Sequence, residues 1–524
     1  MASNGHYSLS ALRRGLASFA VGKPITGLLR LAIVLMIVQA LDKRDYGTYL
    51  GLEAAIQTML ALSLVGCDWV ALRYLPEYRA KSSNARVMVF ALKVLALRLA
   101  VLVAVFLCIW WQAEALVDLV GLDGRAAVLR LFLFVLLFDG IAEFLRAVIF
   151  EALLWQGAAQ SNMVFRNALF VFALAVSWWL VDWEQLGVQQ VITVEIVATC
   201  AALVLAVMQF LWYGSRNAST PGDAAADLAI PVRDMLMLGW NNYLSHLLAI
   251  GSSLQLVLLV ITRMFGPETA SSFGFGKTLT DQARKYLPAT LLAGLIRPKL
   301  IADYAVGGDF QMLNRRAVLV YKVSMVLLAV ALVILGVAGA PLLDLISGGK
   351  FGAETGLVIA MLLTLVPFVH RTTLTTVANA LTLSSALAKG AASALVALPL
   401  VVVTLEMGFG LISAAIAVLA GELLHNIVIL RSIRRAGHPY QVATGFVFKL
   451  AIVCLVSASP GLLLQFLGAS VAGISIALAS SMALFAGFLW LFRPIDQWER
   501  SSLRRIIGRP PPEAAPPPSD ENVK

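Results

Sequence analysis

The sequence predicts an all-α polytopic membrane protein with about 14 transmembrane helices. Of its 524 residues, 60% are hydrophobic and only 13% are charged, whereas a soluble domain carries about 25% charged residues. The mean hydropathy is +0.85. Apolar runs of about 20 residues, the length that crosses a bilayer, recur along the whole chain. A soluble protein is therefore excluded.

The apolar runs separate into a series of predicted spans. They cover residues 16–41, 46–72, 87–111, 127–154, 164–182, 188–213, 234–262, 268–295, 316–343, 353–380, 388–405, 409–431, 443–467 and 469–492. The first run is too long for the apolar segment of a signal peptide, and no small-residue cleavage site follows it. We therefore expect it to remain in the membrane as the first span.

The longest loop, GSRNASTPGDAAADLAIPV, covers residues 214–232 and divides the first six spans from the next six. This predicts an N-lobe at 1–213 and a C-lobe at 233–435, joined by a cytoplasmic linker. Residues 436–492 are then two extra spans. The tail, 493–524, ends in the Pro-rich RPPPEAAPPPSDENVK and is expected to be disordered and cytoplasmic.

Lysine and arginine outside the spans concentrate on one side of the predicted topology. The N-terminus, the tail and the loops after even-numbered spans hold most of them, and Arg166, at the start of span five, is counted with the loop that precedes it. The opposite side holds only Lys43, Arg44, Arg125, Arg263 and Lys350. Because basic loops stay in the cytoplasm, both termini are expected there. The net charge of +10 then reflects topology, and nucleic acid is not an expected partner.

The eighth span carries a charged stripe in the segment GFGKTLTDQARKYLP, residues 274–288. Lys277, Asp281, Arg284 and Lys285 lie at i, i+4, i+7 and i+8, so they share one helix face. A phosphate-binding loop does not explain the stripe, because Ser271 stands where that motif requires glycine. A charge at the bilayer centre costs at least about 2.5–3.5 kcal/mol. The stripe should therefore face protein or a wet cavity.

Other spans also carry charges at membrane depth, so both lobes should contribute to one polar cavity. The predicted substrate-binding residues are Lys23, Arg30, Lys277, Arg284, Lys285 and Arg371, and the predicted ion-coupling acids are Asp281, Asp139 and Glu143. Asp139, Glu143 and Arg146 share a face of span four at i, i+4 and i+7. An internal ion pair that locks helices together explains these three residues equally well.

The predicted cavity contains more cations than acids, and an excess of buried cations calls for an anionic partner. Arginine binds phosphate bidentately and lysine binds it as a point charge, so a lipid-linked phosphate is the expected ligand. Outward movement of two uncompensated negative charges gains up to about 4.6 kcal/mol at 100 mV. No motif for ATP hydrolysis is present, so transport would be secondary, with a proton or cation as counter-ion.

Metal and cofactor chemistry is not expected. The four cysteines, Cys67, Cys108, Cys200 and Cys454, lie inside apolar runs and form no CxxC pair. They therefore suggest neither a metal site nor a disulfide framework.

Several short segments carry a resemblance to a known family. They are Gly22-Lys23, DYGTY at 45–49, RYLPEYRAK at 73–81, the polar eighth span followed by RPKL, and the GGKFGAE turn before span ten. With these segments the chain resembles, over nearly its whole length, the O-antigen and exopolysaccharide flippases of the multidrug/oligosaccharidyl-lipid/polysaccharide exporter superfamily. The resemblance implies two six-helix lobes around a central cavity, often with two extra C-terminal helices.

The resemblance also implies a function. Such proteins move an undecaprenyl-diphosphate-linked oligosaccharide outward by alternating access, for extracellular polysaccharide synthesis. The expected location is the bacterial cytoplasmic (inner) membrane, with membrane lipids and other polysaccharide-assembly proteins as partners. Cationic cavity residues on spans one and eight are a feature of the lipid II flippase branch, and Lys23, Arg30, Lys277, Arg284 and Lys285 occupy comparable spans.

Two rival functions remain at this point. A drug or toxin extruder of the same superfamily would be expected to have an acidic or apolar cavity with few lysines. A membrane glycosyltransferase or polysaccharide polymerase commonly has a long outer loop with catalytic acids, whereas here DKRD at 42–45 is the only acidic pair worth testing. We therefore expect a transporter rather than an enzyme.

Overall fold

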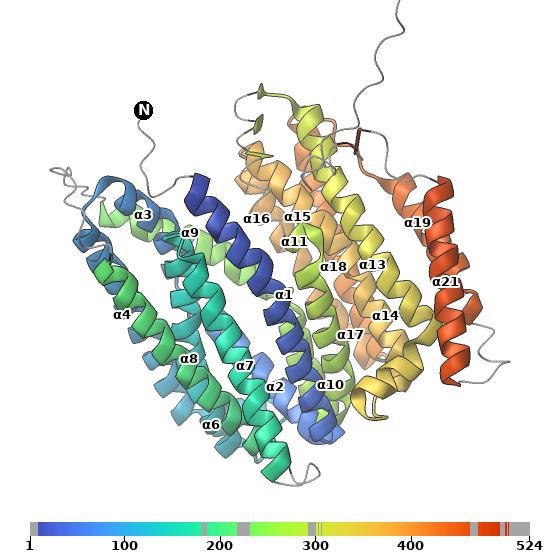
Figure 1. Ribbon diagram of the computed structural model, residues 1–524, viewed down its shortest axis with the longest axis horizontal. Helices are drawn as coiled ribbons and strands as arrows, with labels where there is room; N and C mark the ends of the chain where they lie inside the picture. Colours follow the sequence, from blue (N-terminus) through green and yellow to red (C-terminus); the bar gives the residue numbers. More distant parts are fainter. Residues whose placement is uncertain are drawn as a thin grey trace, which may run out of the picture. The chain divides into compact units, whose positions relative to one another are not determined.

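The computed structural model describes residues 9–180, 186–216, 231–291, 300–301, 303–304, 307–461, 470–492, 498–499 and 501. Within these ranges all regular secondary structure is helical (Figure 1). The elements are α1 (Leu9–Ala40), α2 (Lys43–Leu62), α3 (Cys67–Lys81), α4 (Asn84–Trp111), α5 (Ala113–Val120), α6 (Ala126–Glu143), the π-helical η2 (Phe144–Phe150), α7 (Gln156–Leu180), α8 (Val188–Arg216), α9 (Val232–Ile250), α10 (Leu254–Tyr286), α11 (Pro288–Leu291), α13 (Phe310–Ser347), the 3₁₀ turn η5 (Gly352–Glu354), α14 (Thr355–Leu363), α15 (Leu365–Ala380), α16 (Ser384–Ala394), α17 (Ala397–Glu406), α18 (Leu411–Arg435), α19 (Thr444–Ala458) and α21 (Val471–Phe492).

Many of these helices are long and apolar enough to cross a membrane. Among the described residues there are nine such helices, or up to eleven if each of two bent pairs is one span. The pairs are α2 with α3, bent by 53°, and α9 with α10, bent by 45°. The prediction of a multi-pass, all-α membrane protein is confirmed, while the number of about 14 spans stays a prediction.

The described chain divides into two compact units. Unit 1 contains residues 1–286, 340–371 and 383–432, and unit 2 contains 287–339, 372–382 and 433–524. The predicted lobes at 1–213 and 233–435 remain predictions. The predicted linker lies outside the described residues except at its ends, 214–216 and 231–232, and the predicted tail is described only at 498–499 and 501.

Within unit 1, α2 packs along α10 (Figure 1). The two backbones approach closely because glycines lie at the contact. A Cβ atom added at Gly47 would lie 1.7 Å from the carbonyl oxygen of Pro267, and one at Gly274 would lie 2.5 Å from a methyl carbon of Leu50. This close pairing holds the charged stripe of α10 against α2.

Helix α10 is interrupted at Gly266, whose φ of 78° and ψ of 174° are not helical. Glycine adopts a positive φ without the steric penalty of a side chain. Pro267 follows directly and has no N–H to continue the helical hydrogen bonds. The interruption lies between the predicted seventh and eighth spans, so the boundary drawn there from the sequence coincides with a real break.

Four further helices of unit 1 complete a polar interior. α1 packs against α7, and α6 packs against α8. At the first contact Gly22 admits Gln160, whose Cβ would lie 2.8 Å from an added Cβ. Together with α2 and α10, these four helices supply every residue that lines the first cavity described below.

A lysine joins the turn after α13 to the end of α1. The Lys350 ammonium donates to the backbone carbonyls of Val38, Gln39 and Leu41 at 2.9, 2.8 and 2.7 Å. The last carbonyls of a helix have no partners within it, so Lys350 caps α1. The adjacent Phe351 is fully buried, with its ring 4.6 Å from that of Phe275.

In unit 2, α19 packs on α21, and Lys322 of α13 pairs with Glu499 at 2.7 Å. Large apolar side chains such as Leu455 of α19 and Trp490 of α21 are exposed. Such an apolar exterior is what a helix facing lipid presents.

Candidate functional site

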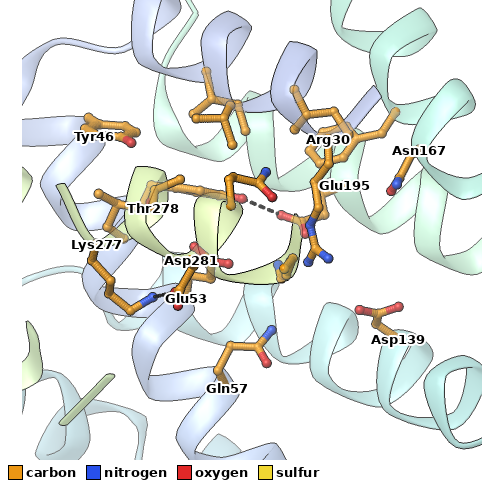
Figure 2. Close-up of a pocket in the computed structure, with 18 of the residues that line it drawn as sticks. Arg30, Tyr46, Glu53, Gln57, Asp139, Asn167, Glu195, Lys277, Thr278 and Asp281 are labelled. Atoms are coloured by element: carbon orange, nitrogen blue, oxygen red, sulfur yellow. Dashed lines mark hydrogen bonds and ion pairs between the residues drawn. The ribbon is translucent and has the colours of Figure 1, made fainter. Parts of the chain in front are cut away.

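The first cavity opens among α1, α2, α6, α7, α8 and α10 and encloses about 820 Å³, counting the open space at its mouth. Figure 2 shows Arg30 and Asp139 on one side of this space and Lys277 with Asp281 on the other. Its lining consists of Arg30, Ile33, Val34, Ile37, Tyr46, Tyr49, Leu50, Glu53, Gln57, Asp139, Arg166, Asn167, Phe170, Glu195, Lys277, Thr278, Asp281, Gln282 and Lys285. Side chains that lie far apart in the sequence therefore share one polar chamber.

One wall of the first cavity is a network of buried charges. Arg166 contacts Asp139 at 3.2 Å and Glu195 at 3.4 Å. Asp139 also pairs with Arg146 at 3.0 Å, and the Tyr49 hydroxyl donates to Glu195 at 3.0 Å. The side chains of Arg166, Asp139 and Glu195 are only 10–13% exposed. Because buried charges are tolerated when paired and hydrogen-bonded, this wall is a fixed part of the structure.

The remaining charged side chains of the first cavity have fewer ion-pair partners. Lys277 pairs with Asp281 one helical turn away at 3.0 Å. Among the described residues, Arg30, Lys285 and Glu53 make no ion pair or side-chain hydrogen bond, although all three line the cavity. Two cations and one acid are thus available to a ligand.

A second cavity shares Lys277 and Asp281 with the first and encloses about 910 Å³, counting the open space at its mouth. Its lining consists of His246, Ala249, Ile250, Ser252, Ser253, Leu254, Gln255, Lys277, Thr280, Asp281, Arg284, Thr364, Leu365, Phe368, Arg371, Val418 and Glu422. Arg371 pairs with Glu422 at 2.8 Å, and Arg284 lies 3.6 Å from Asp281. Both guanidinium carbons are 5.0 Å from the Phe368 ring centre, within the range of cation–π attraction.

The structure distributes the predicted site residues over both cavities. Arg30, Lys277, Lys285, Asp281 and Asp139 line the first, and Lys277, Asp281, Arg284 and Arg371 line the second. The other two predicted residues line neither cavity. Lys23 lies on α1 two turns before Arg30, and Glu143 is exposed at the end of α6. The roles assigned to all of them stay predictions.

Sequence reasoning missed two charged residues of the first cavity, Arg166 and Glu195. The prediction that Arg166 lies in a cytoplasmic loop is wrong, because α7 begins at Gln156 and buries it. Glu195 interrupts the apolar run VITVEIVATC. A single acid in such a run could have indicated a buried charged site. With these residues the lining of the first cavity holds four basic and four acidic side chains, so the lining as a whole has no net surplus of cations.

The fold and the charged chambers define a multi-pass membrane protein with a polar interior. No protein-family model and no curated protein matches the chain, but solved structures do. It resembles "Lipid II flippase MurJ, inward closed conformation", with a TM-score of 0.65 and 11% identity over 94% of this chain and 99% of that one. It also resembles a multidrug resistance MATE family transporter of the MOP superfamily. The inward-facing form gives a TM-score of 0.58 with 13% identity over 78% of this chain and 94% of that one. The outward-facing form gives 0.56 with 15% identity over 81% and 95%. The chain therefore has the fold of these transporters and flippases, none of which is described as an enzyme.

Proposed function

We propose that this chain is a flippase that moves a polyprenyl-diphosphate-linked oligosaccharide from the inner to the outer leaflet of a bacterial cytoplasmic membrane. It acts by alternating access as a secondary transporter, with both termini in the cytoplasm, and supplies extracellular polysaccharide synthesis together with other assembly proteins. Within this proposal it is not an enzyme. Asp281, Asp139 and Glu143 are the candidate acids for coupling to a proton or another cation.

The observation that carries the proposal is the pair of cations in the first cavity, Arg30 and Lys285, that make no ion pair among the described residues. Asp139, Glu195 and Asp281 each contact at least one basic side chain. Among the described residues, Glu53 is the only acid of this lining without an ion-pair partner. Arg30 and Lys285 therefore leave a local positive surplus. A diphosphate accepts hydrogen bonds from a guanidinium and an ammonium without displacing an existing ion pair. The fold shared with a lipid II flippase supports the same ligand class.

The acids of the first cavity favour a second candidate, a cation-coupled drug or toxin extruder. Glu53 has no ion-pair partner among the described residues, and it shares the cavity with Asp139, Glu195 and Asp281. Carboxylates attract the organic cations that such extruders carry, and the chain shares its fold with multidrug transporters.

Reconstitution into proteoliposomes tests the two candidates together. The flipping rate of a fluorescent undecaprenyl-diphosphate oligosaccharide is measured for the wild type, Arg30→Gln and Lys285→Met. We expect each variant to flip at least about tenfold more slowly, because each removes a phosphate contact that is worth about 1.4 kcal/mol or more in the transition state. Lys93→Met, at an exposed position on α4, is the matched control and should keep the wild-type rate.

The same vesicles, loaded with a cationic rhodamine dye, measure ion-driven export. Equal flipping by the wild type, Arg30→Gln and Lys285→Met would refute the proposed site. Dye export that Glu53→Gln abolishes, without any flipping by the wild type, would establish the extruder instead. Sugar transfer catalysed by the purified chain would show that it is an enzyme.

A further inference from the structure

The second cavity contains polar groups that the protein itself does not satisfy. Four of its lining side chains have a buried polar atom without a hydrogen-bond partner: His246 Nε2, Gln255 Oε1, Thr280 Oγ1 and Glu422 Oε2. Thr280 is only 1% exposed and Glu422 9%. Leaving buried polar atoms unpaired is costly, and such groups in a native structure call for an explanation such as a role in the protein's function or a bound water or ion.

The charged groups of the second cavity are held in place. Arg371 is tied to Glu422 at 2.8 Å, and Arg284 lies between Asp281, at 3.6 Å, and the ring of Phe368. These guanidinium groups still have N–H donors to spare, because an arginine carries five. The cavity lining therefore combines arginine donors with the acceptor side chains of glutamate and glutamine.

This mixture of donors and acceptors identifies the chemistry of the ligand. A phosphate only accepts hydrogen bonds and an ammonium only donates them, whereas a hydroxyl does both. Ser252 and Ser253, at the bend between α9 and α10, add two more hydroxyls to the lining.

We propose that the second cavity binds the saccharide part of the substrate, while the first cavity binds its diphosphate. The inference rests on the proposed function, since it assigns two parts of one lipid-linked sugar to two adjoining chambers. Lys277 and Asp281 line both cavities and form the shared wall across which the two parts join.

The test is protection of single cysteines from maleimide in the purified full-length chain. The four native cysteines, Cys67, Cys108, Cys200 and Cys454, are first replaced by alanine. Ser253→Cys then reports on the second cavity and Val34→Cys on the first. If the Ser253→Cys variant does not fold, Ser252→Cys, which lines the same chamber, is used in its place.

Two probes separate the two chambers. The first is a phosphate-free sugar. It is released by mild acid from the lipid-linked saccharides of the cells that make this protein. The second is inorganic pyrophosphate, and mannitol is the control for an unspecific polyol effect. We expect the sugar to slow labelling of Ser253→Cys at least fivefold and to leave Val34→Cys within twofold. Pyrophosphate should do the reverse.

A matched pair of substitutions tests whether the unpaired polar atoms contribute to binding. Gln255→Leu removes the amide from the second cavity, and Gln57→Leu removes the same group from the first. We expect Gln255→Leu to raise the half-protecting sugar concentration at least fivefold and Gln57→Leu to leave it unchanged. Equal effects of the two substitutions would contradict the inference.

The outcomes separate this inference from the proposed function. If pyrophosphate protects Val34→Cys but the sugar does not protect Ser253→Cys, the diphosphate cavity stands and the saccharide chamber is refuted. Protection of Ser253→Cys by mannitol, by pyrophosphate or by sodium ions alone also refutes it. If the sugar protects Ser253→Cys while pyrophosphate protects neither reporter, the saccharide chamber stands and the diphosphate cavity fails.

Discussion

At the scale of single residues, Arg166 is the central charge of the first cavity wall. It contacts both Asp139 and Glu195, and all three side chains are nearly inaccessible. Removing one member of a buried ionic cluster leaves the others uncompensated, which costs about 3–5 kcal/mol. Arg146 remains beside Asp139, but in the described residues Glu195 has no second basic contact.

We expect Arg166→Gln to lower the free energy of unfolding by about 3–5 kcal/mol, because two carboxylates lose their shared guanidinium. Thermal unfolding of the purified chain in detergent measures the loss. The matched control is Arg130→Gln. Arg130 lies 3.4 Å from Glu114, but their side chains are 34% and 77% exposed, so the change should stay below about 1 kcal/mol. Equal losses in both variants would show that the wall is not a fixed structural element.

The ease of predicting a charged residue depended on how local its partners are. The stripe on α10 followed from helical spacing alone, and Lys277, Asp281 and Arg284 do pair at i+4 and i+3. Arg371 was also expected at membrane depth, but its partner Glu422 lies 51 positions away. No periodicity encodes such a contact, because it depends on which helices become neighbours.

At the scale of helices, the α2–α10 contact depends on the absence of a side chain at Gly47. An alanine there would place its Cβ 1.7 Å from the backbone oxygen of Pro267, and backbone cannot rotate away as a flexible side chain does. The two helices would have to separate along a packed interface, and protein interiors tolerate such overpacking poorly.

We expect Gly47→Ala to destabilise the protein by about 1–3 kcal/mol or more through this overpacking. Thermal unfolding in detergent measures the effect. Gly487→Ala in α21 is the matched control, since nothing lies within 4 Å of the added Cβ. That control should be neutral or stabilising by up to about 1 kcal/mol, because alanine favours a helix over glycine. An unchanged melting temperature for Gly47→Ala would contradict the described helix contact.

Helix breaks differed in how well the sequence predicted them. The break at Gly266-Pro267 falls at the boundary predicted between spans seven and eight, and both residues disfavour a continuous helix. The 53° bend between α2 and α3 was not, and residues 46–72 were expected as one span. The backbone there has φ of 44° at Val65 and 84° at Gly66. Buried Arg98 of α4 donates to both the carbonyl and the hydroxyl of Ser63, so a distant residue holds the bend.

At the scale of the whole molecule, the apolar composition predicted a multi-pass helical protein. A chain segment in lipid must satisfy its backbone hydrogen bonds internally, and a helix does so. The same apolar character hides which helices pair, since lipid-facing and helix-facing positions are both apolar. The Lys350 contact illustrates the limit. It was counted as one of few cations on the outer side, and its role as a helix cap needs a partner 309 to 312 positions away.

We expect Lys350→Met to destabilise the protein by about 1.5–3 kcal/mol, the usual value of hydrogen bonds to a charged group. The last carbonyls of α1 lose three donors at once. Thermal unfolding measures the change. Arg44→Met, which removes an exposed charge from the first turn of α2, is the control and should have little effect. A melting temperature for Lys350→Met equal to that of Arg44→Met would contradict the capping role.

The cap on α1 also has a consequence for biogenesis. A chain is synthesised from its N-terminus, and early segments fold before later ones exist. Helix α1 is synthesised before the residue whose amine completes its final turn, because Lys350 lies 309 to 312 positions further along the chain. A nascent chain released before residue 350 therefore leaves these carbonyls at the end of α1 without the lysine, and synthesis must pass residue 350 before the cap can form.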